Sequence, residues 1–204
     1  MSKKATPDHP IHELIARRWS PYAFADHPVS RDDIVSLFEA ARWAASSYNE
    51  QPWSYVVARR HDEPDAFATL LSCLVEGNQV WARHASVLAL GIVSQRFRRN
   101  DKPNAAAQHD LGLASATLTF EATVRGLVVH QMIGILPDRA REVYAIPDGA
   151  DALTGLAIGY AGKAATLPET LRPRDTAPRT RKPLADFVFG ARWGETAPVI
   201  SAPS

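Results

Sequence analysis

The chain has 204 residues, 46% of them hydrophobic, and its 23 basic and 22 acidic side chains leave a net charge of +1. This length suffices for one sizeable core and is short for two, so we expect residues 1–204 to form a single domain. The balanced charge gives no indication of a nucleic-acid or membrane partner, and any anion site must be local. No apolar run is long enough for a signal peptide or a membrane span, so we expect a cytoplasmic protein.

The N-terminal half is predicted to alternate helices and strands. In chain order we expect a helix over residues 10–18, a helix over 31–46, a strand over 53–58, a helix over 64–75 and a buried strand over 87–93. Ser30 is a favourable N-cap for the second helix, with Asp33 as its capping-box partner. The single cysteine, Cys73, lies in an apolar run, which favours a buried side chain and excludes an intrachain disulfide.

The C-terminal half begins with a basic segment and continues into a long apolar helix. We expect a surface loop or lid over residues 94–108, a helix over 109–129, a short helix after Pro137, a strand over 153–161 and an extended segment over 163–183. The helix over 109–129 is apolar on most sides, so it must be buried in a core or between subunits. Because strands and helices mix without a regular βαβ rhythm, the pattern predicts an α+β fold.

Several common catalytic and binding motifs are absent from the sequence. It has no GxGxxG dinucleotide fingerprint, no GxxxxGK[ST] phosphate loop, no HExxH and no GxSxG. The seven histidines lack metal-ligand spacing, so no metal site is expected. The pattern therefore gives no support for a hydrolase or a metalloenzyme.

Two basic clusters could hold a phosphate. Arg17, Arg18 and Ser20 stand together at the end of the first helix, and the planar fork of arginine suits phosphate oxygens. Arg179 and Arg181 alternate in an extended segment, so both side chains would point the same way and could grip one anion. The alternatives are solvated arginines at a helix end and a solvated basic tail.

A third cluster, residues 46–53, lies between a helix and a strand. It places hydroxyl and amide groups within a few residues, and such groups can donate and accept hydrogen bonds at the edge of a heteroaromatic ring. An ordinary helix-to-strand loop is the alternative, since Ser and Asn favour turns. Trp53 is less ordinary, because loops rarely contain a tryptophan without burying it.

Taken in order, these motifs resemble the nitroreductase family of FMN-dependent oxidoreductases over about residues 11–194. The segment 18–20, Arg-Trp-Ser, matches the family's Arg-x-Ser. The segment 47–53 matches its Ser-x-Asn-x-Gln-Pro-Trp, which is the most specific of the matches. A long helix ending in Gly-Leu at 126–127 precedes the family's flavin-facing loop, and the basic pair at 179 and 181 precedes its C-terminal arm.

The resemblance implies a fold, an assembly and an activity. The fold would be an α+β sandwich with a mixed or antiparallel sheet flanked by helices. Two chains would form an intertwined homodimer that exchanges its C-terminal arms, residues 185–204 here. Each FMN would take hydride from NADH or NADPH and pass it to a nitroaromatic, a quinone or another small organic acceptor, in ping-pong order.

The resemblance also implies the residues around the cofactor. The FMN phosphate and ribityl chain would meet one segment of this chain and the basic pair, which together comprise Arg18, Trp19, Ser20, Tyr22, Arg179 and Arg181. The other subunit would contribute Ser46, Ser47, Asn49 and Gln51. Beside the isoalloxazine ring we expect Gln131, Met132, Ile133 and Gly134.

Some features depart from the family pattern or have no assigned role. Tyr22 stands where many members have Lys or Arg, and Ala45 stands where a proline is common. No side-chain acid or base is evident, so we name no catalytic residue. Pocket-lining candidates are Tyr22, Trp81, Arg96 and Phe97, although Trp81 would equally suit the core; His130 is expected to be a satisfied histidine at a helix end.

Three other functions remain open at this stage. The same scaffold could reduce enals or semialdehydes, remove halogen reductively or fragment flavin. A flavin-binding or flavin-storage protein would bind FMN without turning it over. A structural α+β domain would bind no cofactor at all.

Overall fold

The computed structural model describes residues 3–200, and its centre is a four-stranded sheet with the order β1-β2-β4-β3. The strands are β1 (Trp53–Arg59), β2 (Val87–Ser94), β3 (Val128–Met132) and β4 (Ala150–Gly159). Each neighbouring pair is antiparallel. The α+β prediction is therefore confirmed, and the sheet is antiparallel rather than mixed.

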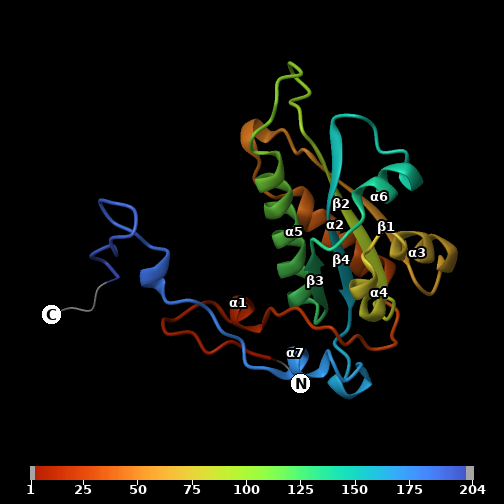
Figure 1. Ribbon diagram of the computed structural model, residues 1–204, viewed down its shortest axis with the longest axis horizontal. Coiled ribbons are helices and arrows are strands. Elements are labelled where there is room, and N and C mark those ends of the chain that lie inside the picture. Colours follow the sequence, from red (N-terminus) through yellow and green to blue (C-terminus); the bar gives the residue numbers. More distant parts are fainter. Residues whose placement is uncertain (1–2, 201–204) are drawn as a thin grey trace.

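Helices cover both faces of this sheet (Figure 1). They are α1 (Glu13–Arg17), α2 (Arg31–Arg42), α3 (Pro64–Leu71), α4 (Glu76–Ala82), α5 (Ala107–Val124), α6 (Pro137–Tyr144) and α7 (Arg172–Thr176), with 3-10 turns η1 (Ser47–Asn49), η2 (Ala164–Thr166) and η3 (Leu184–Asp186). Helices α2 and α5 lie on one side, and α3, α4 and α6 lie on the other. No helix within residues 3–200 is both long and apolar enough to cross a membrane.

The alternation of side chains along β2 builds two cores. Val87 and Ala89 face the α2–α5 side, where they join Leu37 and Leu118. Leu88 and Leu90 point the other way and join the cluster that includes Trp81 and Leu74. Because strand side chains alternate between faces, a central strand covered on both sides has to be apolar throughout, as the sequence of residues 87–93 predicts.

The apolar run predicted as one helix over residues 109–129 is divided between a helix and a strand. Helix α5 ends where Gly126 takes a left-handed conformation with φ of +75°. The Leu127 N–H then donates to the Ala122 carbonyl at 2.8 Å and the Gly126 N–H to the Thr123 carbonyl at 3.3 Å, which is a Schellman cap. The prediction was wrong beyond residue 124, because a continuously apolar run has no period that separates a buried helix from a buried strand.

Other boundaries differ from the predictions in smaller ways. Helix α2 stops at Arg42 instead of Ser46, and the helix predicted over 64–75 ends at Leu71 and is followed by the unpredicted α4. Strand β4 starts at Ala150 instead of Leu153. The segment predicted to be extended over 163–183 contains η2 and α7. The Ser30 N-cap is confirmed, since its Oγ accepts from the Asp33 N–H at 3.0 Å. Cys73 is buried, as expected.

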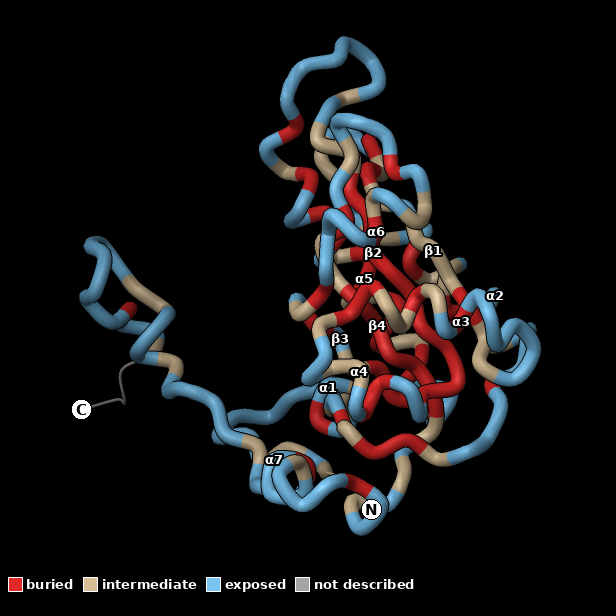
Figure 2. Tube along the Cα trace, turned by 45° about the vertical axis from the view of Figure 1, so that its right-hand side comes forward, coloured by how far each residue is buried: buried red, intermediate tan, exposed pale blue. Residues whose placement is uncertain are grey.

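Beyond α7 the chain leaves the body of the molecule (Figure 1). Figure 2 shows this arm as a largely exposed segment beside a buried interior. Its tip folds back on itself through a bridge between Phe189 and Thr196. Phe187 is 48% exposed and Trp193 is 93% exposed, so a single chain leaves large apolar side chains of the arm uncovered.

We expect the Leu37→Ala variant to lower the free energy of unfolding by about 2–5 kcal/mol, because it opens a cavity between α2 and the sheet. Val35→Ala is the matched control on the same helix, since Val35 is 54% exposed and Leu37 is fully buried. The control should stay within about 0.5 kcal/mol of the parent chain. Chemical denaturation measures both, and equal losses would contradict the assigned orientation of α2.

Candidate functional site

A basic cavity of about 660 Å³ lies between the N-terminal segment, α1 and the start of the C-terminal arm. Arg18, Arg179, Arg181 and Lys182 line it, and Asp8 is the one acidic residue among the described residues of its wall. The structure thus brings Arg18 of the first basic cluster together with Arg179 and Arg181, about 160 residues away in the sequence, whereas Arg17 does not line the cavity.

The arginines of this cavity are surrounded by like charge. Burial lowers the pKa of Arg18, and the charges of Arg179 and Arg181 lower it further. Burial and the neighbouring Arg181 likewise lower the pKa of Arg179. Within residues 3–200 no ion pair joins any of the three to a carboxylate. An anion in the cavity would relieve this repulsion, whereas a cation or a neutral ligand would not.

Hydrogen bonds hold two of these arginines in place. The Arg18 Nη1 donates to the Ser20 Oγ at 3.0 Å, which brings the hydroxyl of the Arg-Trp-Ser segment to the same guanidinium. The Arg179 Nη1 donates to the carbonyls of Ala16 at 2.7 Å and Lys3 at 3.2 Å. The end of α1 and the N-terminal segment therefore position the start of the arm.

The loop of residues 46–52 has an unusual backbone. Tyr48, Asn49 and Gln51 have φ values of +53°, +55° and +52°, in the left-handed region that side chains disfavour. Such conformations cost about 1–3 kcal/mol each and persist only where the surroundings enforce them. The buried Asp110 of α5 supplies one such constraint, because its Oδ2 accepts from the Ser47 N–H at 3.0 Å.

Further contacts fix this loop from its other sides. The Ser46 Oγ accepts from the Gln51 N–H at 3.0 Å. The buried Glu50 accepts from the Arg98 N–H at 2.7 Å, which ties the loop to residues 95–106. Residues 95–106 form the surface loop that the sequence predicts, and of the suggested pocket residues Phe97 lies against Tyr48, with ring centroids 5.9 Å apart.

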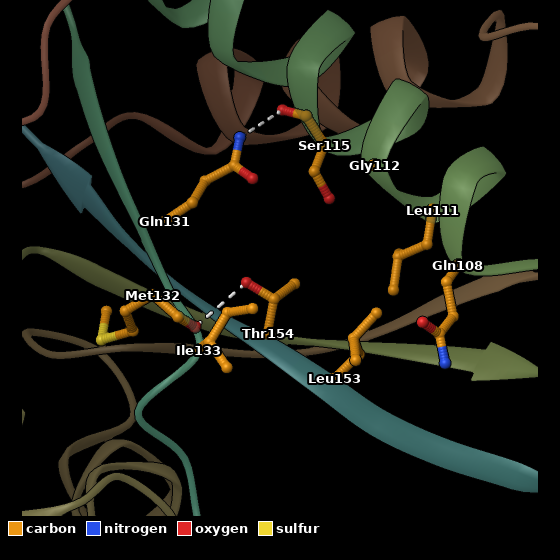
Figure 3. A pocket seen from close by; sticks show the side chains of 9 residues that line it. All are labelled: Gln108, Leu111, Gly112, Ser115, Gln131, Met132, Ile133, Leu153 and Thr154. Atoms are coloured by element: carbon orange, nitrogen blue, oxygen red, sulfur yellow. Dashed lines mark hydrogen bonds between the residues drawn. The ribbon is translucent and has the colours of Figure 1, made fainter. Parts of the chain in front are cut away.

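A second cavity, of about 230 Å³, lies between α5, the end of β3 and the middle of β4 (Figure 3). Its lining consists of Gln108, Leu111, Gly112, Ser115, Gln131, Met132, Ile133, Leu153 and Thr154. The Gln131 Nε2 donates to the Ser115 carbonyl at 3.1 Å and to the Thr119 Oγ1 at 2.9 Å, so α5 orients this side chain. We call this space the ring-side cavity, because its wall includes three of the four residues expected beside a ring.

The backbone next to this cavity is fixed in orientation. The Gly134 carbonyl accepts from the Val75 N–H at 3.1 Å and the Asn78 Nδ2 at 2.9 Å. The Ile133 carbonyl accepts from the Ile135 N–H at 2.7 Å. A Cβ at position 134 would overlap the Asn78 side chain, so a larger residue here would displace the Asn78 amide from the Gly134 carbonyl. The Gly134 N–H shares a trans peptide with the Ile133 carbonyl and points away from it, so its direction is defined as well.

An aromatic cluster next to the Arg-Trp-Ser segment consists of Tyr22, Trp81 and His130. Trp81 is only 1% exposed, belongs to the core and is not among the residues that line either cavity. His130 lies in β3 rather than at a helix end, and it bonds to the Pro21 carbonyl at 2.9 Å through its Nδ1. Burial lowers the pKa of His130, which keeps the ring neutral. The prediction that His130 is a satisfied histidine is confirmed, but the residue lies in a strand and not at a helix end.

Helix α5 sets the spacing of these parts. Phe120 lines the basic cavity, Ser115 lines the ring-side cavity and Asp110 anchors the loop of residues 46–52. At a rise of about 1.5 Å per residue, Phe120 lies about 7.5 Å from Ser115 and about 15 Å from Asp110 along the helix. Within one chain, Ser46, Ser47, Asn49 and Gln51 therefore lie at the opposite end of α5 from the basic cavity.

Sequence reasoning missed three contributors to this arrangement. Asp110, Asn78 and Ser115 hold the loop, the Gly134 backbone and Gln131, yet none belongs to a recognisable motif. Asp110 carried a usable signal, because an acidic residue inside an apolar helix has to meet a partner. The other two gave no signal that distinguishes them from ordinary polar residues.

The comparisons with known proteins agree with this geometry. The family model described as "Nitroreductase family" matches residues 15–160. A solved structure described as an oxidoreductase containing FMN is 35% identical, covers 96% of this chain and 99% of its own, and superposes with a TM-score of 0.88.

Two curated relatives give a similar picture at the level of sequence. A 15.4 kDa uncharacterized protein of Mycolicibacterium smegmatis is 34% identical over 69% of this chain and 97% of its own length. The major NAD(P)H-flavin oxidoreductase of Aliivibrio fischeri is 39% identical over 30% of this chain and 31% of its own. The chain belongs to the nitroreductase family.

We expect Asp110→Ala to loosen the loop of residues 46–52, because it leaves the Ser47 N–H without its acceptor. An unpaired buried donor costs about 1–3 kcal/mol, so the loop amides should exchange with solvent about tenfold or more faster. Hydrogen exchange followed by mass spectrometry measures this. Asp110→Asn keeps an acceptor and should restore protection, and the exposed Asp148→Ala should change nothing; unchanged exchange in Asp110→Ala would remove Asp110 from this role.

Proposed function

We propose that the chain is an FMN-dependent oxidoreductase that takes hydride from NADH or NADPH and reduces small organic acceptors such as nitroaromatics or quinones. One observation carries the proposal: Arg18, Arg179 and Arg181 converge on one cavity without a carboxylate partner in the described chain. A terminal phosphate fits this cavity, because its charge offsets the repulsion and its oxygens suit the guanidinium fork. The FMN named for the solved relative supports the choice of phosphate ligand.

The ring-side cavity fits the other end of the same cofactor. Its walls are largely apolar, and its nearest α5 residue, Ser115, lies about 7.5 Å along the helix from Phe120 of the basic cavity, which leaves room for a ribityl chain between phosphate and ring. The exposed Ile133 would offer an apolar contact to a ring, and the N–H of the adjacent Gly134 would be the candidate donor to the ring edge. FMN, when bound, supplies the hydride chemistry, while the protein supplies position and electrostatics.

The chain's own groups perform binding and orientation rather than proton transfer. None of the described residues that line the ring-side cavity is Asp, Glu, His, Lys, Arg or Tyr, so protons would come from solvent. The sequence has no dinucleotide fingerprint, so the nicotinamide donor and the acceptor would use one exposed flavin face in turn. This order gives ping-pong kinetics.

The same proposal requires a homodimer. Along α5 a stripe of partly exposed side chains, Leu113, Ala116, Thr117, Phe120 and Val124, faces away from the sheet. If two α5 helices meet in antiparallel orientation about a two-fold axis, the N-terminal end of one lies beside the C-terminal end of the other. That arrangement brings residues 46–51 of one chain to the basic cavity of its partner, as the family pattern requires.

The direct test is the absorption spectrum of the purified protein, followed by release of the bound flavin on denaturation. We expect a yellow protein that releases FMN, is bleached rapidly by NADH or NADPH, and gives parallel lines in double-reciprocal plots. A colourless protein that takes up no FMN would overturn the proposal. A bound flavin that no nicotinamide reduces would instead favour a storage protein.

We expect Arg181→Ala to weaken FMN binding by about one to two decades, because a charge-assisted phosphate contact is worth about 1.5–3 kcal/mol. Arg179→Ala should behave similarly, although it also loses bonds to Ala16 and Lys3. Titration of the apoprotein with FMN measures the affinity. Arg139→Ala, which removes an arginine of α6 outside the cavity, is the control. Unchanged FMN affinity in both cavity variants would indicate that Arg179 and Arg181 belong to a solvated basic tail.

We expect a chain truncated before Ala185 to lose dimer and FMN together. The truncation removes Phe187 and Trp193, whose exposed rings in the single chain need a covering surface. Obligate dimers bury about 2,000–5,000 Å² and often lack a stable monomer. Light scattering and the flavin spectrum are measured on the same sample, with a chain ending at residue 200 as the control. A monomer that retains FMN would contradict the assignment of residues 46–51 to the partner's site.

A further inference from the structure

A cluster of aromatic and cationic side chains lies outside both cavities, where the loop of residues 46–52 meets residues 95–106. We call it the Tyr48 platform; it consists of Tyr48, Phe97 and Arg99. The two rings meet edge to face with centroids 5.9 Å apart. The Arg99 guanidinium lies 4.1 Å from the centroid of the Tyr48 ring and 5.1 Å from that of Phe97.

The platform is exposed and yet fixed in place. Tyr48 is 75% exposed and holds a left-handed backbone conformation, which a bulky residue rarely adopts without a functional or structural reason. Residues 95–106 are closed by a bridge between Arg96 and Pro103 and by a bond from the Phe97 N–H to the Lys102 carbonyl at 2.9 Å. The Glu50–Arg98 contacts join the two loops, so the rings keep their relative positions.

The charges around the platform leave one guanidinium free. Residues 95–106 contain four cations, Arg96, Arg98, Arg99 and Lys102, against the single acid Asp101, in a chain whose net charge is +1. Arg96 pairs with Asp101, and Arg98 pairs with Glu50. Arg99 pairs with no carboxylate in the described part of the chain and contacts only the two rings among its charged or aromatic neighbours. Its N–H groups are therefore available to an anion, and stacking limits its mobility.

We propose that the Tyr48 platform binds the adenosine 2′-phosphate end of NADPH and makes this chain prefer NADPH to NADH. The inference rests on the proposed function, because it supplies a seat for the nicotinamide donor. Adenine can stack on an aromatic or guanidinium face, and the fork of Arg99 suits the oxygens of a phosphate monoester. NADH carries a hydroxyl in place of that phosphate and gains much less from Arg99.

The position of the platform agrees with this use. With no dinucleotide fingerprint in the chain, the adenylate half of the donor has to be held by another surface. Tyr48 belongs to the same loop as Ser47, Asn49 and Gln51, which are assigned to the flavin of the proposed dimer. A donor whose nicotinamide lies on that flavin would therefore extend past this loop.

The test compares Arg99→Ala with Lys102→Ala, which removes the same charge from the same loop but lies outside the platform. The parent enzyme should show a kcat/KM for NADPH about tenfold or more above that for NADH. Arg99→Ala should lose about tenfold with NADPH and keep its value with NADH, while Lys102→Ala keeps most of the preference. Arg99→Lys, which keeps the charge without the planar fork, should recover only part of the loss.

A binding measurement provides a readout that does not depend on turnover. Adenosine 2′,5′-bisphosphate should bind the parent protein about tenfold or more tightly than adenosine 5′-monophosphate by calorimetry, and Arg99→Ala should abolish the difference. An equal loss in Arg99→Ala and Lys102→Ala would overturn the proposal in favour of general charge attraction. An unchanged NADPH preference in Arg99→Ala would also overturn it. So would a loss of activity in Arg99→Ala that appears only with anionic aromatic acceptors, because the platform would then bind the acceptor and not NADPH.

The two proposals fail in distinguishable ways. If the parent protein binds no FMN, the proposed oxidoreductase function fails first. If it binds FMN and turns over with NADH, but Arg99→Ala leaves the ratio of the two donors unchanged, only the role of the Tyr48 platform fails.

Discussion

Helix α5 is the constraint on which the arrangement of the candidate site depends. It is buried along most of its length, and its position is therefore fixed by the sheet and by α2. From this fixed helix Asp110 holds the loop of residues 46–52, the Ser115 carbonyl and Thr119 hold Gln131, and Phe120 closes one wall of the basic cavity. The buried hydroxyls of Thr119 and Thr123 on this helix are paired, because each donates to the carbonyl four residues earlier.

The site concentrates features that oppose folding. Three arginines face each other across one cavity, and three residues of one loop have left-handed backbones. Each of these features costs free energy in the empty chain, and the two apolar cores on either side of β2 offset them. A fold selected for stability alone would place a carboxylate among the arginines and glycines in the loop. The unfavourable features at both places are the physical reason to propose that ligands bind there.

How far the sequence predicts this structure differs from feature to feature. The Ser30 cap, the buried β2 and the α+β class follow from local chemistry, an apolar run and the order of the elements, which one sequence displays. The division of residues 109–129 into α5 and β3 depends on a Schellman cap at Gly126 inside an apolar run, where periodicity carries no information. The meeting of Arg18 with Arg179 depends on tertiary packing, and only the resemblance to a family indicated it in advance. Asp110 and Asn78 act through single long-range bonds that no motif records.

The spacing along α5 also gives a physical reason for the two chains of the proposed dimer. One helix carries a basic cavity near its C-terminal end and an anchored, donor-rich loop near its N-terminal end, about 15 Å apart. A rigid helix cannot bring its own ends together, but a two-fold axis across its middle superposes the opposite ends of two copies. In the proposed dimer such a site would form only as the subunits associate, so ligand binding, assembly and burial of the exposed arm would be one equilibrium. Under the proposed function, a chain of this length would bind a large cofactor without adding a second domain.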